Sequence, residues 1–394
     1  MRTESRSDAM DGVTPFFLLD LARVSAAARG IRSVLDAYES APVMAYAAKV
    51  NPHPRVLETV LTHGMAVEVV SRRELHLARS AGFPGRRIIV NGPAKPDELL
   101  VEAMEAGATL HLESHHQIER AIALRGGRAA RVGLRIQLPG APTSRFGLPL
   151  AELSPAAGRL RDAGIRISGL HVHGSELPHG ASARDWQRRA ETLGEGLRHL
   201  GQARGDVRHL DWGGGIVAPD LDTPAADDFA EAAREVIRLV HQETQRLGEM
   251  YGLPSLGAVL EPGRFLTEHA GTLHTTCVDA VDSAGRRLHV LDAGVGLLSG
   301  YDSWLGRYRV SGGGPDRRAA FAGPSCMEED LLPERPVEGE PDVGSRIVLT
   351  RAGAYHLAGV NAFYHEAPGV EFLPAGAEPP GDNTNERDDT EASG

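Results

Sequence analysis

The chain has 394 residues, 41% of them hydrophobic and 24% charged, which is long enough for one to three domains with apolar cores. Its net charge of −11 argues against nucleic-acid binding, which needs a basic surface, and no apolar run reaches the roughly 18 residues of a membrane span. The N-terminus lacks the apolar segment of a secretory signal, and Cys277 and Cys326 are too few for a disulfide scaffold, so we expect a cytoplasmic protein.

The two ends of the chain differ in composition from the middle. Residues 1–12 are polar, and residues 374–394 are acidic, rich in Pro, Gly and Asn, and almost without large apolar side chains. Such segments cannot bury enough apolar surface to offset the entropy of folding. We expect both to be disordered.

Residues 13–31 begin with an apolar run typical of a strand, which we expect to join a C-terminal β domain. From residue 32 to 270, short apolar runs alternate with amphipathic segments. Strands are predicted at 42–50, 65–71, 86–92, 108–114, 130–138, 167–174, 207–215 and 256–263. Helices are predicted between them, including 33–40, 54–64, 72–82, 95–107, 185–201 and 227–248. Strands separated by helices pair in parallel, and eight of them favour a (β/α)8 barrel over an open doubly wound sheet.

The pattern changes after about residue 270. Strand-like segments follow one another there, divided by glycine and proline turns. Such a succession predicts a smaller all-β domain over residues 271–373.

The basic residues are unevenly divided, because only Lys49 and Lys95 are lysines among 42 basic residues. A codon bias that favours arginine explains most of this. A lysine that persists under such a bias is a candidate for chemistry closed to arginine, because a neutral amine can form an imine with an aldehyde. Lys49 ends a predicted strand, and functional residues of a (β/α)8 barrel gather where its strands end. A plain surface lysine is the alternative.

Three further groups follow predicted strands. Gly213, Gly214 and Gly215 could turn backbone amides toward a phosphate, although glycine triplets also serve as plain turns. Glu261 and Arg264 could hold a ring nitrogen and a phosphate, or simply pair with each other. His171 and His173 lie on one strand face, where an imidazole could stack on an aromatic ring or be structural. We find no third ligand that would make the histidines a metal site. Together these groups suggest a pyridoxal 5'-phosphate (PLP) site, in which the protein orients the cofactor and the cofactor is the electron sink.

At this point the sequence resembles the fold-type III PLP-dependent decarboxylases, the diaminopimelate and ornithine decarboxylase family. The matching motifs run in order from about Thr14 to Phe372. They are TPFFLLD, AYAAKVNP, EVVSRREL, NGPAKPDEL, LHLES, SRFG, GLHVHGS, DWGGGI, EPGR, GPSCMEEDLL and AGAY. The resemblance implies an alanine-racemase-like barrel with a C-terminal β domain, active as a homodimer with shared active sites.

The resemblance also implies roles for single residues. Lys49 would bind the cofactor covalently, His173 would stack on its ring, and Glu261 would face its ring nitrogen. Cys326 would reach across the dimer interface as the acid that protonates the substrate carbon. The other cofactor-binding residues implied in this way are Arg135, Ser175, Gly213, Gly214, Gly215, Gly263, Arg264 and Tyr355.

Two departures from the family pattern concern the substrate. Gly300 stands where diaminopimelate decarboxylases have an arginine for the substrate carboxylate, and Met327 stands where an acid usually receives a distal ammonium. Asp330, Glu328 or Glu329 could take over that function, so we predict Met327 and Asp330 as substrate-binding residues. We expect decarboxylation of an α-amino acid or a derivative, conjugated or carrier-bound, in a specialised pathway. An amino-acid racemase and an inactive regulatory homologue are the alternatives.

Overall fold

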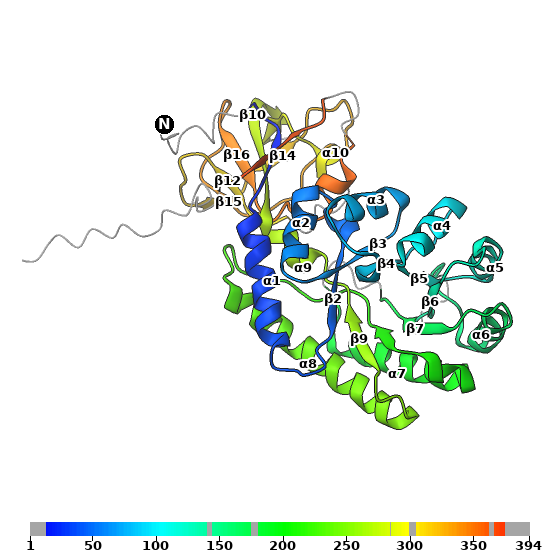
Figure 1. Ribbon diagram of the computed structural model, residues 1–394. Helices are drawn as coiled ribbons and strands as arrows, with labels where there is room; N and C mark the ends of the chain where they lie inside the picture. The colour runs from blue at the N-terminus through cyan, green and yellow to red at the C-terminus, as the bar shows by residue number, and fades with distance from the viewer. Residues whose placement is uncertain are drawn as a thin grey trace, which may run out of the picture.

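The computed structural model describes residues 13–139, 144–174, 180–283, 285–298, 305–361 and 366–374. Two bodies make up this part of the chain, a barrel surrounded by helices and a β domain beside it (Figure 1). The predicted disordered end 1–12 and all of the predicted disordered end 374–394 except Pro374 lie outside the described residues, as do Ser175 and Gly300. No helix among those described is long and apolar enough to cross a membrane.

Eight parallel strands close the barrel, which confirms the predicted fold class. In order they are β2 (Val43–Ala47), β3 (Ala66–Val69), β4 (Ile88–Val90), β5 (Thr109–Leu112), β6 (Arg131–Arg135), β7 (Ile167–His171), β8 (His209–Asp211) and β9 (Gly257–Leu260). Each strand pairs with the next, and β9 returns to β2 through Val43 and Val259. The carboxyl ends of all eight strands therefore meet at one mouth.

Helices cover the outside of the barrel. They are α1 (Leu21–Leu35), α2 (Pro54–Thr62), α3 (Arg72–Ser80), α4 (Asp97–Ala106), α5 (His115–Leu124), α6 (Leu153–Asp162), α7 (Ala183–Leu200) and α8 (Ala226–Tyr251). Their starts follow local chemistry: the Ser71 and Ser114 side chains accept backbone N–H groups of the first turns of α3 and α5. The helix predicted at 33–40 was wrong, because the helix instead begins after the Asp20 cap and ends at Leu35.

The segment 13–31 divides between the two bodies. Strand β1 (Phe16–Leu19) pairs with β10 (Gly271–Ser283) and β17 (Gly369–Phe372). Helix α1, in contrast, buries Val24, Ala27 and Ile31 in the core of the barrel. It packs so closely on α8 that a Cβ at Gly30 would lie 2.4 Å from the Ala226 carbonyl oxygen. Glycine permits this approach.

The β domain is built on a long strand, β10, that pairs with β1, β11 and β16. Its further strands are β11 (Arg286–Leu291), β12 (Tyr308–Val310), β13 (Asp316–Arg317), β14 (Ala320–Ala322), β15 (Val337–Glu338) and β16 (Arg346–Leu349). A separate core fills it, in which Phe17, Leu273 and Tyr308 are fully buried. The domain has its own apolar interior and also contacts the barrel, for example through the Tyr355 backbone and through Arg309 on β12.

Candidate active site

Lys49 lies at the mouth of the barrel, just beyond the end of β2. The strand ends at Ala47, three residues earlier than predicted, and a 3₁₀ turn (Ala48–Val50) carries the lysine. Its Nζ donates a hydrogen bond to Glu68 Oε2 on β3 at 2.5 Å. Burial alone would lower the pKa of Lys49, but the carboxylates of Glu68 and Glu261 outweigh it and raise that pKa. The amine is therefore held as a cation beside a base.

The glycine triplet after β8 forms a tight loop at the same mouth. Gly213 and Gly215 have φ angles of 70° and 113°, which residues with a Cβ rarely adopt. A Cβ at Gly213 would lie 2.9 Å from His173 Cδ2, and one at Gly214 would lie 2.8 Å from the Glu261 carbonyl oxygen. The loop is thus pressed between the histidine and the β9 end. Backbone conformation requires glycine at two of the three positions, and close packing requires it at the third.

Residues 261–264 continue from β9 into a short helical turn. Glu261 is buried, and a Cβ at Gly263 would lie 2.4 Å from Val50 Cγ2, so the turn fits closely against the segment that carries Lys49. Arg264 places its Nη1 3.2 Å from Oε2 of the buried Glu268. Glu261 and Arg264 therefore do not form the mutual salt bridge that was the alternative, because each has other neighbours.

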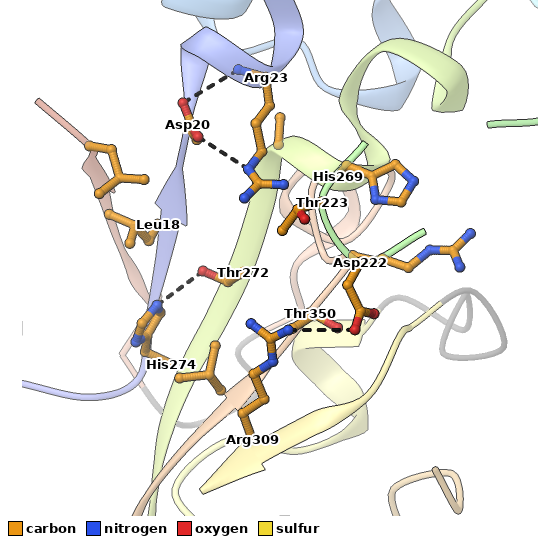
Figure 2. Close-up of a pocket in the computed structure, with 14 residues that line it drawn as sticks. Leu18, Asp20, Arg23, Asp222, Thr223, His269, Thr272, His274, Arg309 and Thr350 are labelled. Atoms are coloured by element: carbon orange, nitrogen blue, oxygen red, sulfur yellow. Dashed lines mark hydrogen bonds and ion pairs between the residues drawn. The ribbon is translucent and has the colours of Figure 1, made fainter. Parts of the chain in front are cut away.

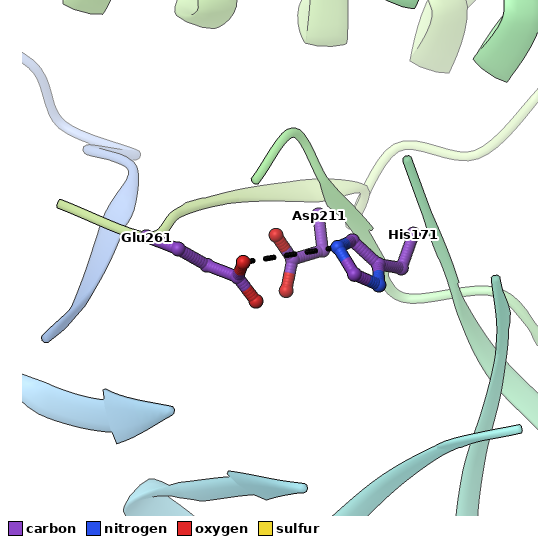
Figure 3. A group of neighbouring side chains, drawn as sticks. All are labelled: His171, Asp211 and Glu261. Carbon is purple, nitrogen blue, oxygen red and sulfur yellow. Dashed lines mark ion pairs between the residues drawn. The ribbon is translucent and has the colours of Figure 1, made fainter. Parts of the chain in front are cut away.

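Beneath the mouth, three buried side chains face one another (Figure 3). Ligand atoms of His171, Asp211 and Glu261 all lie within 4.8 Å of one another, and His171 Nε2 is 3.7 Å from Glu261 Oε2. Burial raises the pKa of both carboxyls and lowers that of the histidine. Among the described residues, neither His171 ring nitrogen nor Glu261 Oε2 has a hydrogen-bond partner. This geometry could hold a cation, whether a metal ion or a protonated nitrogen of a ligand.

Arg135 is the last residue of β6, and its guanidinium group is held by Glu113. Its Nη1 donates to both carboxylate oxygens of Glu113 at 3.2 Å. The second lysine, Lys95, lies 3.6 Å from the same carboxylate and donates to the Gly92 carbonyl oxygen and to Gln117 Oε1. Burial lowers the pKa of Lys95 to about 8. Lys95 is thus enclosed behind the site, whereas Lys49 faces the cavity.

His173 and Tyr355 flank the cavity from opposite bodies. His173 follows β7, and its Nδ1 contacts the Gly174 carbonyl oxygen; burial and then the charge of Arg189 lower its pKa well below the usual range. Tyr355 has a φ of 66°, and its backbone N–H donates to the Val50 carbonyl oxygen at 2.7 Å. The backbone of the β-domain tyrosine is thereby tied to the turn that carries Lys49.

These groups line one cavity of about 660 Å³. Among the predicted residues, it is bordered by Lys49, Arg135, His173, Gly214, Gly215, Glu261, Gly263, Arg264 and Tyr355. Two arginines without a predicted role, Arg145 and Arg188, also border it, as does Phe146. The cavity therefore carries more positive than negative side chains.

The β-domain residues predicted for the chemistry lie apart from this cavity. Cys326 and Met327 are exposed and do not line it. Asp330 is buried, and its carboxylate accepts the backbone N–H groups of Val295 and Ser325 at 2.8 and 2.9 Å. Within the single chain, Asp330 organises the loop that carries Cys326; its substrate contact and the roles of Cys326 and Met327 stay predictions.

Sequence reasoning missed three polar residues of the site. Glu68 contacts Lys49, Asn91 Nδ2 donates to Glu261 Oε1 at 2.5 Å, and His111 Nδ1 meets Asn91 Oδ1 at 2.9 Å. A signal was present, because Glu68 and His111 interrupt otherwise apolar strand runs. Buried charged and polar side chains need partners, so such interruptions mark positions that face other polar groups.

A second, smaller hollow of about 50 Å³ lies where the start of α1 and the loop after β8 meet the strands of the β domain (Figure 2). Its arginines are already paired: Arg23 Nε lies 3.2 Å from Asp20 Oδ2, and Arg309 Nη2 lies 3.6 Å from Asp222 Oδ2. The Arg309–Asp222 pair joins β12 to the loop after β8, whereas Arg23 pairs with the N-cap of its own helix, so the hollow lies at a junction between the two bodies.

Comparison with known proteins supports a PLP site. A family model described as "Pyridoxal-dependent decarboxylase, pyridoxal binding domain" matches residues 21–268. A diaminopimelate decarboxylase of Actinosynnema pretiosum subsp. auranticum is 30% identical, over 88% of this chain and 80% of its own. A lysine/ornithine decarboxylase of Selenomonas ruminantium is 25% identical, over 83% and 82%. The crystal structure of diaminopimelate decarboxylase from M. jannaschi has a TM-score of 0.79 at 20% identity and covers 93% of this chain and 88% of that one.

The chain therefore belongs to the pyridoxal-dependent decarboxylase family. It is a PLP-dependent enzyme that decarboxylates an amino acid, and the predictions of family, enzyme class and cofactor are confirmed.

The residues present fit this cofactor. A ring with a protonated nitrogen would give Glu261 Oε2 the partner that it lacks among the described residues. In the glycine loop, Gly214 and Gly215 border the cavity without side chains, so their backbone N–H groups can bind a phosphate, whereas the Gly213 N–H donates to Asp211 Oδ1 at 2.9 Å. Lys49 supplies an amine at the cavity wall. One cavity thus has an amine that could bind an aldehyde, a carboxylate that could face a pyridine nitrogen, and a glycine loop that could bind a phosphate.

Proposed function

We propose that this enzyme decarboxylates an α-amino acid or an amino-acid derivative in a specialised biosynthetic pathway, in the cytoplasm. The supporting observation is the cavity at the barrel mouth, which brings the Lys49 amine, the Glu261 carboxylate and the glycine loop to one space of about 660 Å³. This space can hold a cofactor together with a substrate of moderate size.

We assign each residue the task that its position allows. Lys49 would bind the cofactor aldehyde, and Glu68, which accepts its hydrogen bond, is placed to take the proton that the amine must lose. Glu261 would hold a proton on the ring nitrogen, while the Gly213–Gly215 loop and Arg264 would bind the phosphate. Arg135 and Tyr355 would be the remaining cofactor contacts on the cavity wall, and His173 would stack on the cofactor ring. Ser175 is assigned to the cofactor only because its motif resembles that of the family. PLP itself, when bound, supplies the electron sink that loss of carbon dioxide requires.

The substrate is proposed from what surrounds the remaining space. Met327 replaces an acidic residue, so a distal ammonium group would lack that partner. Arg145 and Arg188 add positive charge at the cavity wall beyond what the cofactor uses. Both features favour a substrate whose distal part carries no exposed cation, such as a conjugated or carrier-bound amino acid. Asp330, or its neighbour Glu329, would receive a cationic end if there were one.

The acid that completes the reaction is proposed to come from a second subunit. Cys326 is exposed on a loop ordered by Asp330 and does not border the cavity of its own chain. A two-fold dimer in which each loop enters the partner's cavity would bring Cys326 to the reacting carbon.

Two measurements test this function. The PLP-loaded protein should absorb in the visible, and borohydride reduction should attach the cofactor to Lys49; attachment to Lys95 would overturn the site. Lys49→Arg should lose the visible band and reduce turnover by about 10²-fold or more.

A panel of free and conjugated amino acids should then be tested for carbon dioxide release. Release with at least one substrate, stronger for conjugated than for free cationic amino acids, is expected. Interconversion of D and L forms without carbon dioxide would instead show a racemase.

A further inference from the structure

A row of polar side chains crosses the interior of the barrel beneath the active site. His209 Nε2 on β8 lies 3.2 Å from His111 Nε2 on β5, and His111 Nδ1 lies 2.9 Å from Asn91 Oδ1 after β4. Asn91 Nδ2 donates to Glu261 Oε1 at 2.5 Å. The interior of a (β/α)8 barrel is usually filled by layers of branched apolar side chains, so this row departs from the common pattern.

Two glycines on the neighbouring strands make room for the imidazole rings. A Cβ at Gly133 on β6 would lie 2.4 Å from His111 Cδ2. A Cβ at Gly169 on β7 would lie 2.0 Å from His209 Nε2. The space that side chains of β6 and β7 would take is thus given to the two histidines.

The hydrogen-bond directions in the row follow from the valence of each group. If the Glu261 carboxylate is ionised, it can only accept, so the Asn91 amide nitrogen faces it and the amide oxygen faces His111. His111 must then carry its proton on Nδ1. Because burial lowers the pKa of His111 well below its usual range, its ring is neutral, and Nε2 is an acceptor. His209 therefore donates from Nε2, and every hydrogen in the row points toward Glu261.

We propose that His209, His111 and Asn91 are positioning residues that hold Glu261 as a hydrogen-bond acceptor for the protonated ring nitrogen of the cofactor. This inference rests on the role of Glu261 in the proposed function. The opposite arrangement, with a protonated Glu261 donating to Asn91, would reverse both histidine tautomers and leave Oε2 as the oxygen of a neutral acid, a weaker acceptor for a ring N–H than a carboxylate. The tautomers therefore report the state of Glu261.

The surroundings of Glu261 explain why such support is needed. Its carboxyl group faces Asp211, His171 and Glu68 as well as Lys49. Burial, and next the charge of Glu68, raise the pKa of Glu261, while Lys49 opposes this. Burial and the charge of Glu261 likewise raise the pKa of Asp211. A row of neutral donors favours the ionised form of Glu261 without adding a competing cation.

The first experiment measures the tautomers directly in the PLP-loaded wild-type protein by ¹⁵N NMR of histidine ring nitrogens, with assignments from His111→Leu and His209→Leu. We expect His111 protonated at Nδ1 and His209 at Nε2. His111 protonated at Nε2 would overturn the inference. A protein that fails to bind PLP would instead count against the proposed function, so the two failures are distinguishable.

The second experiment measures the dissociation constant of PLP by absorbance titration of apo-protein variants. Asn91→Leu should weaken binding about tenfold or more, because a hydrogen bond to a charged group is lost, and His111→Leu about 2- to 10-fold. The double variant should bind no more weakly than Asn91→Leu, because both act through one contact. His274→Leu is the control, since burial also lowers the pKa of this β-domain histidine to about 4.

We expect His274→Leu to change the dissociation constant less than about twofold. Additive losses from Asn91→Leu and His111→Leu, or equal losses from His111→Leu and His274→Leu, would show that the histidine is merely a buried structural residue.

Discussion

The barrel and the β domain contribute to the site in different ways. The polar residues of the barrel mouth contact one another within one chain: Lys49 meets Glu68, Asn91 meets Glu261, and Arg135 meets Glu113. In the β domain, two backbone N–H groups donate to Asp330 beside the loop with Cys326, but this loop borders no part of the cavity.

This difference indicates a division of labour. One chain holds the proposed cofactor-binding elements, whereas the proposed acid of the reaction does not border their cavity. Substitutions in the barrel should therefore damage the site of the same chain, and substitutions at Cys326 should damage the site of the partner.

The largest expected effect comes from mixing two inactive variants, Lys49→Ala and Cys326→Ala. Under random subunit exchange half of the dimers are hybrids, and each hybrid has one site with both lesions and one with neither. About a quarter of wild-type activity should therefore return from two preparations that are each almost inactive. Carbon dioxide release after exchange, with hybrid formation shown by native mass spectrometry, is the measurement.

If Cys326 acted within its own chain, each site would keep one lesion. No recovery in a sample with demonstrated hybrids would therefore remove the proposed shared site and leave the assignment of Lys49 intact.

A second prediction concerns the phosphate contact. Arg264→Ala should raise the dissociation constant of PLP about 10- to 150-fold, since a charge-assisted hydrogen bond contributes about 1.5–3 kcal/mol. Arg309→Ala, in the small hollow between the two bodies, is the control and should leave the constant unchanged.

Glu261→Gln should reduce turnover more than cofactor binding. Unfolding of both site variants at room temperature would show that the two residues are structural.

The buried side chain of Lys95 should make the stability of the protein depend on pH. Its pKa of about 8 is below the value of 10.5 usual in an unfolded chain, so the unfolded state binds more protons between these values. The wild-type free energy of unfolding should therefore gain about 3 kcal/mol as pH rises from 8 to 10.5. Lys95→Met should lack this gain. Urea unfolding at several pH values measures the difference, and equal pH slopes for both proteins would contradict it.

The smallest effect is expected in the β domain. Asp330→Ala leaves two backbone amides near Cys326 without their acceptor and should lower the free energy of unfolding by about 1–3 kcal/mol. PLP affinity should stay unchanged, because Asp330 does not border the cavity. Thermal unfolding and absorbance titration check the two parts. A large loss of PLP affinity would show that the two bodies are less separate than their contacts indicate.

Much of the fold and several site residues could be predicted from the sequence. Eight apolar runs divided by helical segments specify a parallel barrel, because both faces of such strands are buried. The strand ends specify its mouth, which is why Lys49, Glu261 and the glycine triplet could be placed together. The scarcity of lysine singled out Lys49 and Lys95 without distinguishing them.

Tertiary structure decided what depends on packing between distant strands. Lys49 reaches the cavity and Lys95 is enclosed behind Glu113, although both follow strands of the same barrel. His111 and His209 meet only because the barrel closes and because Gly133 and Gly169 leave the space between them. Residue spacing in the sequence reveals which side chains of one strand face the barrel interior. It does not reveal which interior side chains from opposite walls of the barrel contact each other, because that depends on how the closed barrel packs.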